Sequence, residues 1–145
     1  MSLELINDRI ALQDLMLNYA AAVDERDIER YRSCFAEDVL VVNFGDQNFQ
    51  GRETWVDHVW AELEKFSSTQ HLLGPQFAQV RGDQAETRSD VQALHYLVSS
   101  ETSAENSEGI TRFILWATYY TTMLRVDGDW KIARHELQVR GSSTE

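Results

Sequence analysis

Cysteine, proline and basic residues are scarce in this sequence, and each shortage excludes a class of structure or function. Of the 145 residues, one is a cysteine, Cys34, and one is a proline, Pro75. A single cysteine excludes an internal disulfide and a cluster of thiolate metal ligands. The surrounding segment "RYRSCFAEDV" indicates a helix end, where we expect Cys34 to pack against the core rather than act as a nucleophile.

The shortage of basic residues limits the partners that the protein can bind. The chain has 13 Lys and Arg against 24 Asp and Glu, for a formal net charge of −11. Nucleic acids and anionic membranes are bound by clusters of Lys and Arg, which this sequence lacks. We therefore expect neither a nucleic-acid partner nor a membrane partner.

Long apolar runs are also absent. No run approaches the roughly 18 residues that a membrane-spanning helix needs. The first residues, "MSLELINDRIALQ", carry acids where a signal peptide has a basic region followed by an apolar one. The sequence thus predicts a cytoplasmic protein.

The composition is that of an ordinary globular protein, with 43% hydrophobic and 26% charged residues. The length fits one domain that spans residues 1–145. A domain of about 150 residues buries roughly 68–70% of the surface of its unfolded chain, which is enough for both a core and a pocket.

Three helices are predicted from the spacing of apolar residues. Residues 5–27 carry apolar side chains at the i, i+3, i+4, i+7 positions of one helical face. A short helix follows, with Asp27 as its N-cap. The segment "GRETWVDHVWAELEKF", residues 51–66, returns to helical spacing.

Strands make up most of the remaining chain. Residues 39–50 read as a strand and hairpin, broken at "GDQN". Four further strands are expected at about 71–81, 84–100, 109–126 and 129–140, turned at "RGDQ", at the polar loop "SSETSAENSEG" and at "VDGDW". This order predicts an α+β fold in which helices cover one face of a strongly bent antiparallel sheet and enclose a hollow.

A few titratable residues lie in apolar surroundings and are candidates for chemistry. Asp24 ends the apolar face of the first helix, Tyr19 lies on that face, His71 begins the strand run, and His95 lies within "VQALHYLV". A carboxylate bonded to one ring nitrogen of a histidine fixes its tautomer, so the other nitrogen can take a proton from carbon or oxygen near neutral pH. Asp24 and His71 can form such a general base.

The same residues also have structural interpretations. Asp at a helix end is commonly a cap or a solvated charge, and His near a strand start is commonly structural. His95 on an apolar face could be a core histidine, and Tyr19 could be a core residue. His58, in "WVDHVW", is interpreted as a surface or packing residue.

The C-terminal run "WKIARHELQVR" offers a possible anion or leaving-group contact. A regular strand places Arg134 on the side of Trp130 and Ile132, with His135 opposite, and a bulge reverses this. Either Arg134 or His135 could therefore point into the hollow. We assign both residues, with the aromatic residues Trp55 and Tyr119, to substrate binding.

Several motifs that would imply a cofactor or metal are missing. The chain has no Gly-rich phosphate loop, no nucleophile elbow and no pair of histidines at metal-ligand spacing. We expect neither a cofactor nor a metal ion.

Three segments carry a resemblance to a known family: "LMLNYAAAVDERDIERYRSCFAEDVLVV", "STQHLLG" and "GDWKIARHEL". Together they resemble the SnoaL-like branch of the nuclear transport factor 2-like superfamily, over residues 5–140. The resemblance implies a cone-shaped α+β barrel, with three helices on a bent sheet around a deep pocket, and assembly as a dimer or trimer. Members include scytalone dehydratase, bile-acid 7α-dehydratase and a hexachlorocyclohexane dehydrochlorinase, which use an Asp and His pair without a cofactor.

Residue by residue, the resemblance implies that Asp24 is the helix-end aspartate and His71 the base. Tyr19 matches the tyrosine of the dehydratases, whereas the dehydrochlorinase has a lysine there, which disfavours dehalogenation. His95 falls where the dehydratases place a second acid or histidine. The arginine that some members carry near the C-terminus corresponds to Arg134 or is replaced by His135.

These features lead to a functional hypothesis with open alternatives. We expect a cofactor-independent, dehydratase-like lyase that acts on a hydrophobic cyclic molecule such as a polyketide or steroid. An isomerase of a cyclic ketone could use the same base. The superfamily also contains non-catalytic binding domains and oligomeric subunits, so fold alone does not assign the activity.

The strand "ILWATYYTTML" has apolar and aromatic residues on both faces. A strand of this kind needs cover on both sides. One side is expected to face the helices and the pocket, and the other a second copy of the chain, in a homodimer or homotrimer.

Overall fold

A computed structural model describes residues 1–98 and 111–145. It contains the predicted three helices and a seven-stranded sheet. The elements in chain order are α1 (Leu3–Asp24), α2 (Ile28–Ser33), β1 (Phe35–Phe44), β2 (Gln47–Gln50), α3 (Arg52–Leu63), β3 (Phe66–Leu73), β4 (Phe77–Arg81), β5 (Gln84–Leu97), β6 (Arg112–Val126) and β7 (Asp129–Thr144). The predicted polar loop "SSETSAENSEG" lies outside the described residues.

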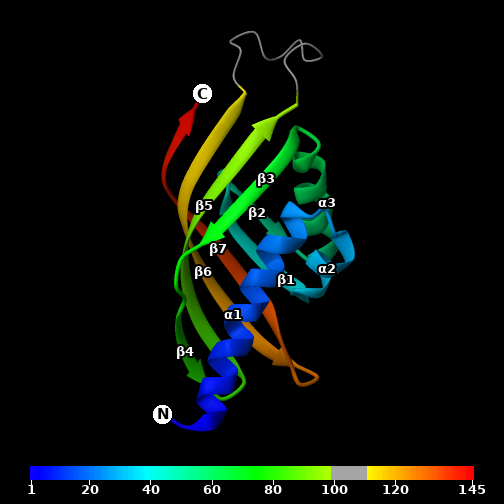
Figure 1. The fold of residues 1–145 in the computed structure, drawn as a ribbon. Coiled ribbons are helices and arrows are strands. Elements are labelled where there is room, and N and C mark those ends of the chain that lie inside the picture. Colours follow the sequence, from blue (N-terminus) through cyan, green and yellow to red (C-terminus); the bar gives the residue numbers. More distant parts are fainter. Residues whose placement is uncertain (99–110) are drawn as a thin grey trace.

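The three helices all lie on one side of the sheet, and the other face of the sheet is left open (Figure 1). The long strands β5, β6 and β7 curve past the helices. The sequence therefore predicted the α+β class and the layering correctly. Among residues 1–98 and 111–145, no helix is both long and apolar enough to span a bilayer.

Helix α1 forms where its apolar stripe can be buried. The Ser2 side chain caps its N-terminus by accepting from Leu5 N–H at 3.1 Å. The residues of the predicted stripe are all buried: Leu12, Leu15, Met16, Tyr19 and Val23. The next helix, α2, begins as predicted at Asp27, whose carboxylate accepts from Arg30 N–H at 3.1 Å.

The strand order is β2-β1-β7-β6-β5-β3, with β4 paired to β5. All pairs are antiparallel except β1 and β7, which run parallel, so the sheet is mixed rather than wholly antiparallel as predicted. The first and last strands are joined by no hairpin, and hence no local turn signal in the sequence sets their relative direction.

The expected strand at 71–81 is two strands in the structure. β3 begins at Phe66, five residues earlier than predicted, and the chain breaks at residues 74–76 before β4 continues along the same strand, β5. Pro75 lies in this break, where its missing N–H removes a ladder donor. Leu73 pairs with Val91 and Phe77 with Arg88, so the three residues of the break face only two residues of β5.

The single cysteine packs where the sequence indicated. Cys34 follows α2, is 2% exposed, and its Sγ lies 3.4 Å from the carbonyl oxygen of Arg30. Burial raises the pKa of this thiol to about 11, and the thiol is therefore protonated at neutral pH. The environment is that of a structural residue.

Candidate active site

Asp24 and His71 form a hydrogen-bonded pair where α1 crosses β3. Asp24 is the last residue of α1, and His71 lies within β3. The ring Nδ1 of His71 lies 2.8 Å from Asp24 Oδ1, and the His71 backbone N–H donates to Oδ2, also at 2.8 Å. Two residues 47 positions apart in sequence are thus joined by both side chain and backbone.

Thr69 completes the surroundings of the Asp24 carboxylate by donating its hydroxyl proton to Oδ1 at 3.0 Å. Burial acts to raise the pKa of Asp24, but the hydrogen bonds from the His71 ring, the His71 backbone and Thr69 together outweigh it and leave this pKa below its ordinary value. Asp24 is therefore ionised at neutral pH.

An ionised carboxylate can only accept hydrogen bonds, so Nδ1 of His71 carries the ring proton. In the neutral form of the ring, the other nitrogen, Nε2, then carries the lone pair. His71 is one of the residues that line a cavity of about 180 Å³ between the helices and the sheet. This arrangement is the one that a general base needs.

The cavity wall is largely aromatic and aliphatic, with a few polar groups. All three helices and strands β1, β3, β5, β6 and β7 contribute to it. Of the predicted site residues, the cavity brings together Tyr19, Trp55, His71, His95 and Tyr119. Asp24 lies behind His71 and is not part of the wall.

Tyr19 lies in the cavity wall with its hydroxyl held from behind by His135. The Tyr19 oxygen is 3.0 Å from His135 Nε2, and His135 Nδ1 is 2.9 Å from the Thr121 hydroxyl. Burial raises the pKa of Tyr19 well above 10 and lowers that of His135 to about 3. Both groups are consequently neutral near pH 7, and Tyr19 retains its phenolic proton.

A bulge in β7 decides which C-terminal residue faces inward. Met123 pairs with Ile132 and Thr122 with Arg134, so Ala133 is the extra residue. His135 consequently lies on the side of Ile132, and both are 0% exposed. This is the reversal that the sequence left open. His135 is not itself a wall residue, and it lies behind Tyr19, Tyr119 and Phe44, which are.

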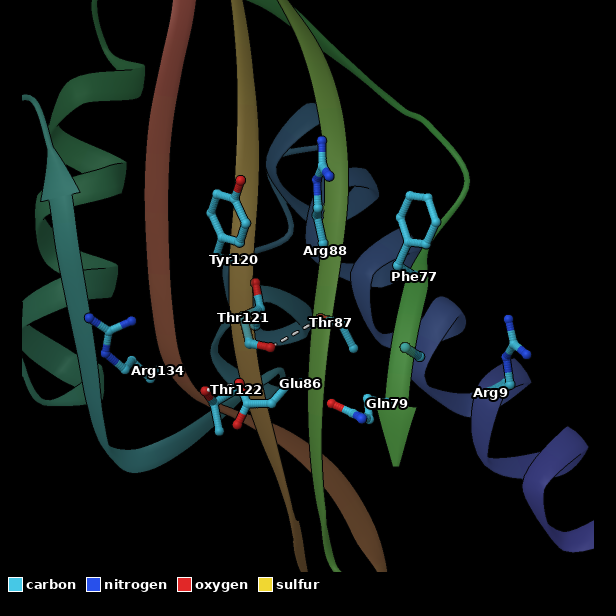
Figure 2. Close-up of a pocket in the computed structure, with 11 residues that line it drawn as sticks. Arg9, Phe77, Gln79, Glu86, Thr87, Arg88, Tyr120, Thr121, Thr122 and Arg134 are labelled. Atoms are coloured by element: carbon cyan, nitrogen blue, oxygen red, sulfur yellow. Dashed lines mark hydrogen bonds between the residues drawn. The ribbon is translucent and has the colours of Figure 1, made fainter. Parts of the chain in front are cut away.

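Arg134 lies on the opposite, open face of the sheet. Its guanidinium is 3.1 Å from Glu136, and the side chain is 44% exposed. It borders a separate, shallow groove of about 370 Å³, where Figure 2 shows it near Thr122 and Glu86 on the neighbouring strands. The cavity that contains His71 has no wall residue in common with this groove.

His95 lies beside His71 on the same face of the sheet. The two ring centroids are 6.0 Å apart, and His95 stacks on Phe113 at 4.1 Å with an interplanar angle of 7°. Burial lowers the pKa of His95 to about 4, and the adjacent His71 adds to this effect. His95 is therefore a neutral hydrogen-bonding group near pH 7.

The sequence interpretation missed three residues at this site: Arg26, Thr69 and Tyr31. Tyr31 is 1% exposed, lines the cavity, and accepts from Trp55 Nε1 at 3.0 Å. Its helical spacing indicated only a core position. Within the described residues, no group of three or more His, Cys, Asp or Glu side chains is placed to hold a metal ion.

Residues 4–136 match the family model of the SnoaL-like domain, and the chain therefore belongs to the SnoaL-like branch of the nuclear transport factor 2-like superfamily. A search of curated proteins gives no match.

Solved structures show the same fold. One is a protein from Novosphingobium aromaticivorans proposed to be a scytalone dehydratase, with 25% identity, a TM-score of 0.82, and coverage of 97% of this chain and 88% of the other. Another is a hexachlorocyclohexane dehydrochlorinase, LinA type 2, with 23% identity, a TM-score of 0.84, and coverage of 99% and 92%. A third, also from N. aromaticivorans, is proposed to be an aromatic ring hydroxylase, with 23% identity, a TM-score of 0.82, and coverage of 97% and 94%.

Proposed function

We propose that this protein is a cofactor-independent lyase that removes water from a small cyclic hydroxy-ketone. The observation that carries the proposal is the Asp24–His71 pair, joined at 2.8 Å, in which His71 is one of the residues that line a mostly apolar cavity. Structural neighbours named as a dehydratase and a dehydrochlorinase support this class of reaction.

The proposed reaction begins with His71. Its Nε2 takes a proton from the carbon next to the substrate carbonyl, and Asp24 stabilises the imidazolium that forms. The electron pair of the broken C–H bond moves onto the carbonyl oxygen as an enolate. Tyr19 donates its hydroxyl proton in a hydrogen bond to that oxygen, because its raised pKa keeps it protonated.

The enolate then re-forms the carbonyl, and a carbon–carbon double bond forms as the β-hydroxyl leaves. The proton held by His71 goes to the departing oxygen, so one water molecule is released and the base is regenerated. His95, uncharged near pH 7, can hydrogen-bond the hydroxyl that leaves. Trp55 and Tyr119 would pack against the ring of the substrate.

The cavity size narrows the substrate class. An apolar cavity of about 150 Å³ accommodates benzene, whereas drug-sized ligands occupy pockets of roughly 300–1,000 Å³. At about 180 Å³, this cavity favours a substrate of one or two rings over the steroid that the sequence suggested.

A screen of one- and two-ring hydroxy-ketones for a new conjugated absorbance tests the proposal. With a substrate found in this way, we expect His71→Ala to lower turnover by about 10²- to 10⁴-fold, as for loss of a general base. Gln70→Ala is the matched control, because Gln70 is the exposed neighbour of His71 in β3. Full turnover in His71→Ala would exclude this mechanism.

The alternatives give different results in the same experiment. An isomerase exchanges substrate hydrogen with deuterated solvent and moves a double bond without losing water. A non-catalytic binding domain binds a ring compound but catalyses neither exchange nor water loss. Mass measurement of the product and of recovered substrate separates the three cases.

A further inference from the structure

Arg26 makes an unusual approach to the Asp24–His71 pair from the turn between α1 and α2. Its Nη1 donates to the carbonyl oxygen of Val23 at 2.6 Å and to the Thr69 hydroxyl at 2.9 Å. Its Nη2 is buried and has no hydrogen-bond partner within the described residues. In a chain of net charge −11, this cation is directed inward rather than left in solvent.

The chemistry of the groups fixes the direction of the hydrogen bonds. A guanidinium can only donate, and a carboxylate can only accept. The Thr69 oxygen must therefore accept from Arg26, and its single proton must go to Asp24 Oδ1 at 3.0 Å. Arg26, Thr69, Asp24 and His71 consequently form one continuous chain with a single possible polarity.

The backbone conformation of Arg26 makes glycine a suitable replacement at this position. Arg26 has a φ of 59°, in the left-handed region that disfavours residues with a Cβ and suits glycine. The turn is closed by backbone hydrogen bonds, from Arg26 N–H to the Val23 carbonyl at 3.1 Å and from Asp27 N–H to the Ala22 carbonyl at 2.8 Å. Glycine at this position therefore removes the guanidinium without straining the turn.

We propose that Arg26 is a positioning residue that acts through Thr69 to hold the Asp24 carboxylate against Nδ1 of His71. The role rests on the proposed function, in which His71 must present an unprotonated Nε2 to the substrate. Oδ1 accepts from both Thr69 and His71, while Oδ2 accepts from the His71 backbone. Without the donor from Thr69, the carboxylate loses one of three hydrogen bonds, and its rotation is less restricted.

Charged and titratable groups from several elements face the Arg26–Thr69–Asp24–His71 chain. These groups also affect how the chain responds to pH. Besides Arg26, they are Tyr19 from α1, Tyr31 from α2, His58 and Glu62 from α3, His95 from β5 and Tyr119 from β6. None of these groups is altered in the variants below. Their effects therefore cancel in a comparison with the wild type.

The first test needs no substrate. In the unliganded protein, the ¹⁵N shifts of the His71 ring report its tautomer, and the ¹³C shift of the Asp24 carboxyl reports its titration. In Arg26→Gly and in Thr69→Val we expect the Nε2–H tautomer of His71 to appear and the pKa of Asp24 to move upward, because Thr69→Val removes the donor to Oδ1 and Arg26→Gly removes the group that orients this donor. Thr69→Ser, which keeps the hydroxyl, should restore the wild-type spectrum.

A matched control separates the effect of losing the guanidinium from the effect of introducing a glycine. Asp46 has a φ of 61° and lies exposed in the turn between β1 and β2, so Asp46→Gly makes the same backbone change far from the site. The proposal is overturned if the His71 tautomer and the Asp24 titration of Arg26→Gly match those of Asp46→Gly. Arg26→Lys provides a second variant if Arg26→Gly fails to fold.

The second test uses turnover. Loss of a hydrogen bond to a charged group corresponds to about a 10- to 100-fold lower kcat in Arg26→Gly. If Arg26 acts through Thr69, adding Arg26→Gly to Thr69→Val should cause little further loss. Additive losses would show that Arg26 acts by another route. An unchanged turnover in His71→Ala would instead reject the proposed function and leave the tautomer result standing.

Discussion

At the scale of single residues, the site depends on which groups can donate hydrogen bonds and which can accept them. The Asp24 carboxylate accepts three hydrogen bonds, from Thr69 and from the ring and backbone of His71. These bonds hold its pKa below the ordinary value against the opposing effect of burial. Because they exist only in the folded chain, they also link the ionisation of Asp24 to stability.

This linkage gives a prediction with a definite sign. A carboxyl whose pKa is lower in the folded state stabilises the fold above its unfolded pKa of about 3.9, and that contribution is lost as pH falls through the folded pKa. We expect Asp24→Asn to be less stable than the wild type at pH 7 and to approach it near pH 3. Urea unfolding at both pH values measures the difference, and a constant gap would contradict the linkage.

Residue-level prediction from sequence succeeded for some groups and missed others for a physical reason. Asp24 and Tyr19 were found because they lie on a helical face whose period is visible in the sequence, and His71 was paired with Asp24 through the family resemblance. Arg26 lies in the acidic run "DERDIE" and reads as a solvated charge. Its inward direction depends on a positive φ and on Thr69, 43 residues away, which no local pattern encodes.

At the scale of elements, a fully buried polar contact joins α1 to the sheet. His135 in β7 links Tyr19 of α1 to Thr121 of β6 through its two ring nitrogens. His135 is 0% exposed, and its partners Tyr19 and Thr121 are 4% and 2% exposed, so all three groups are buried. The contact thus connects the packing of the helix to the orientation of the Tyr19 hydroxyl.

We expect His135→Leu to destabilise the protein by about 1–3 kcal/mol, because it leaves buried hydroxyl groups without a partner. Thermal or urea unfolding measures the change. His58→Leu is the control, since His58 is partly exposed and packs against Phe49 without a comparable buried contact. Equal stabilities for the two variants would show that the buried hydrogen bonds do not contribute.

Element boundaries were predictable to different degrees. The stripe of α1 and the Asp27 cap follow from local spacing and side-chain chemistry, and the structure confirms both. The break at residues 74–76 was missed although Pro75 lies in it, because both halves pair with the same strand, β5. The β7 bulge was anticipated only as an alternative, since burial of His135 selects it.

At the scale of the whole molecule, the open face of the sheet carries large apolar side chains. Leu72, Phe77, Tyr96 and Trp116 are between 40% and 69% exposed. Leu72 and Trp116 both pair with Gln92 of β5, and Phe77 pairs with Arg88 of the same strand. Arg88, Gln92 and Tyr96 are four residues apart along β5, so the register places all four apolar side chains on the same face. Several large exposed apolar side chains on one face, here interspersed with Arg88 and Gln92, are typical of an interaction site.

We propose that a second copy of the chain covers this face, as expected from the strand "ILWATYYTTML". Sedimentation at micromolar concentration should show a dimer or trimer, and Trp116→Lys should shift it toward the monomer. Leu17→Lys is the control, because Leu17 is 49% exposed on α1, away from the sheet face. A wild-type protein that sediments as a monomer would contradict the proposal.

The parallel pairing of β1 with β7 has a consequence for how the chain acquires its structure. β7 lies between β6 and β1, so the β1–β2 hairpin has no neighbour in the sheet until residues 129–144 are present. During synthesis at roughly 5–20 residues per second, the β1–β2 hairpin must wait for β7. Closing so long a loop delays folding. β7 also brings His135 to Tyr19, so the cavity wall is completed only when β7 inserts.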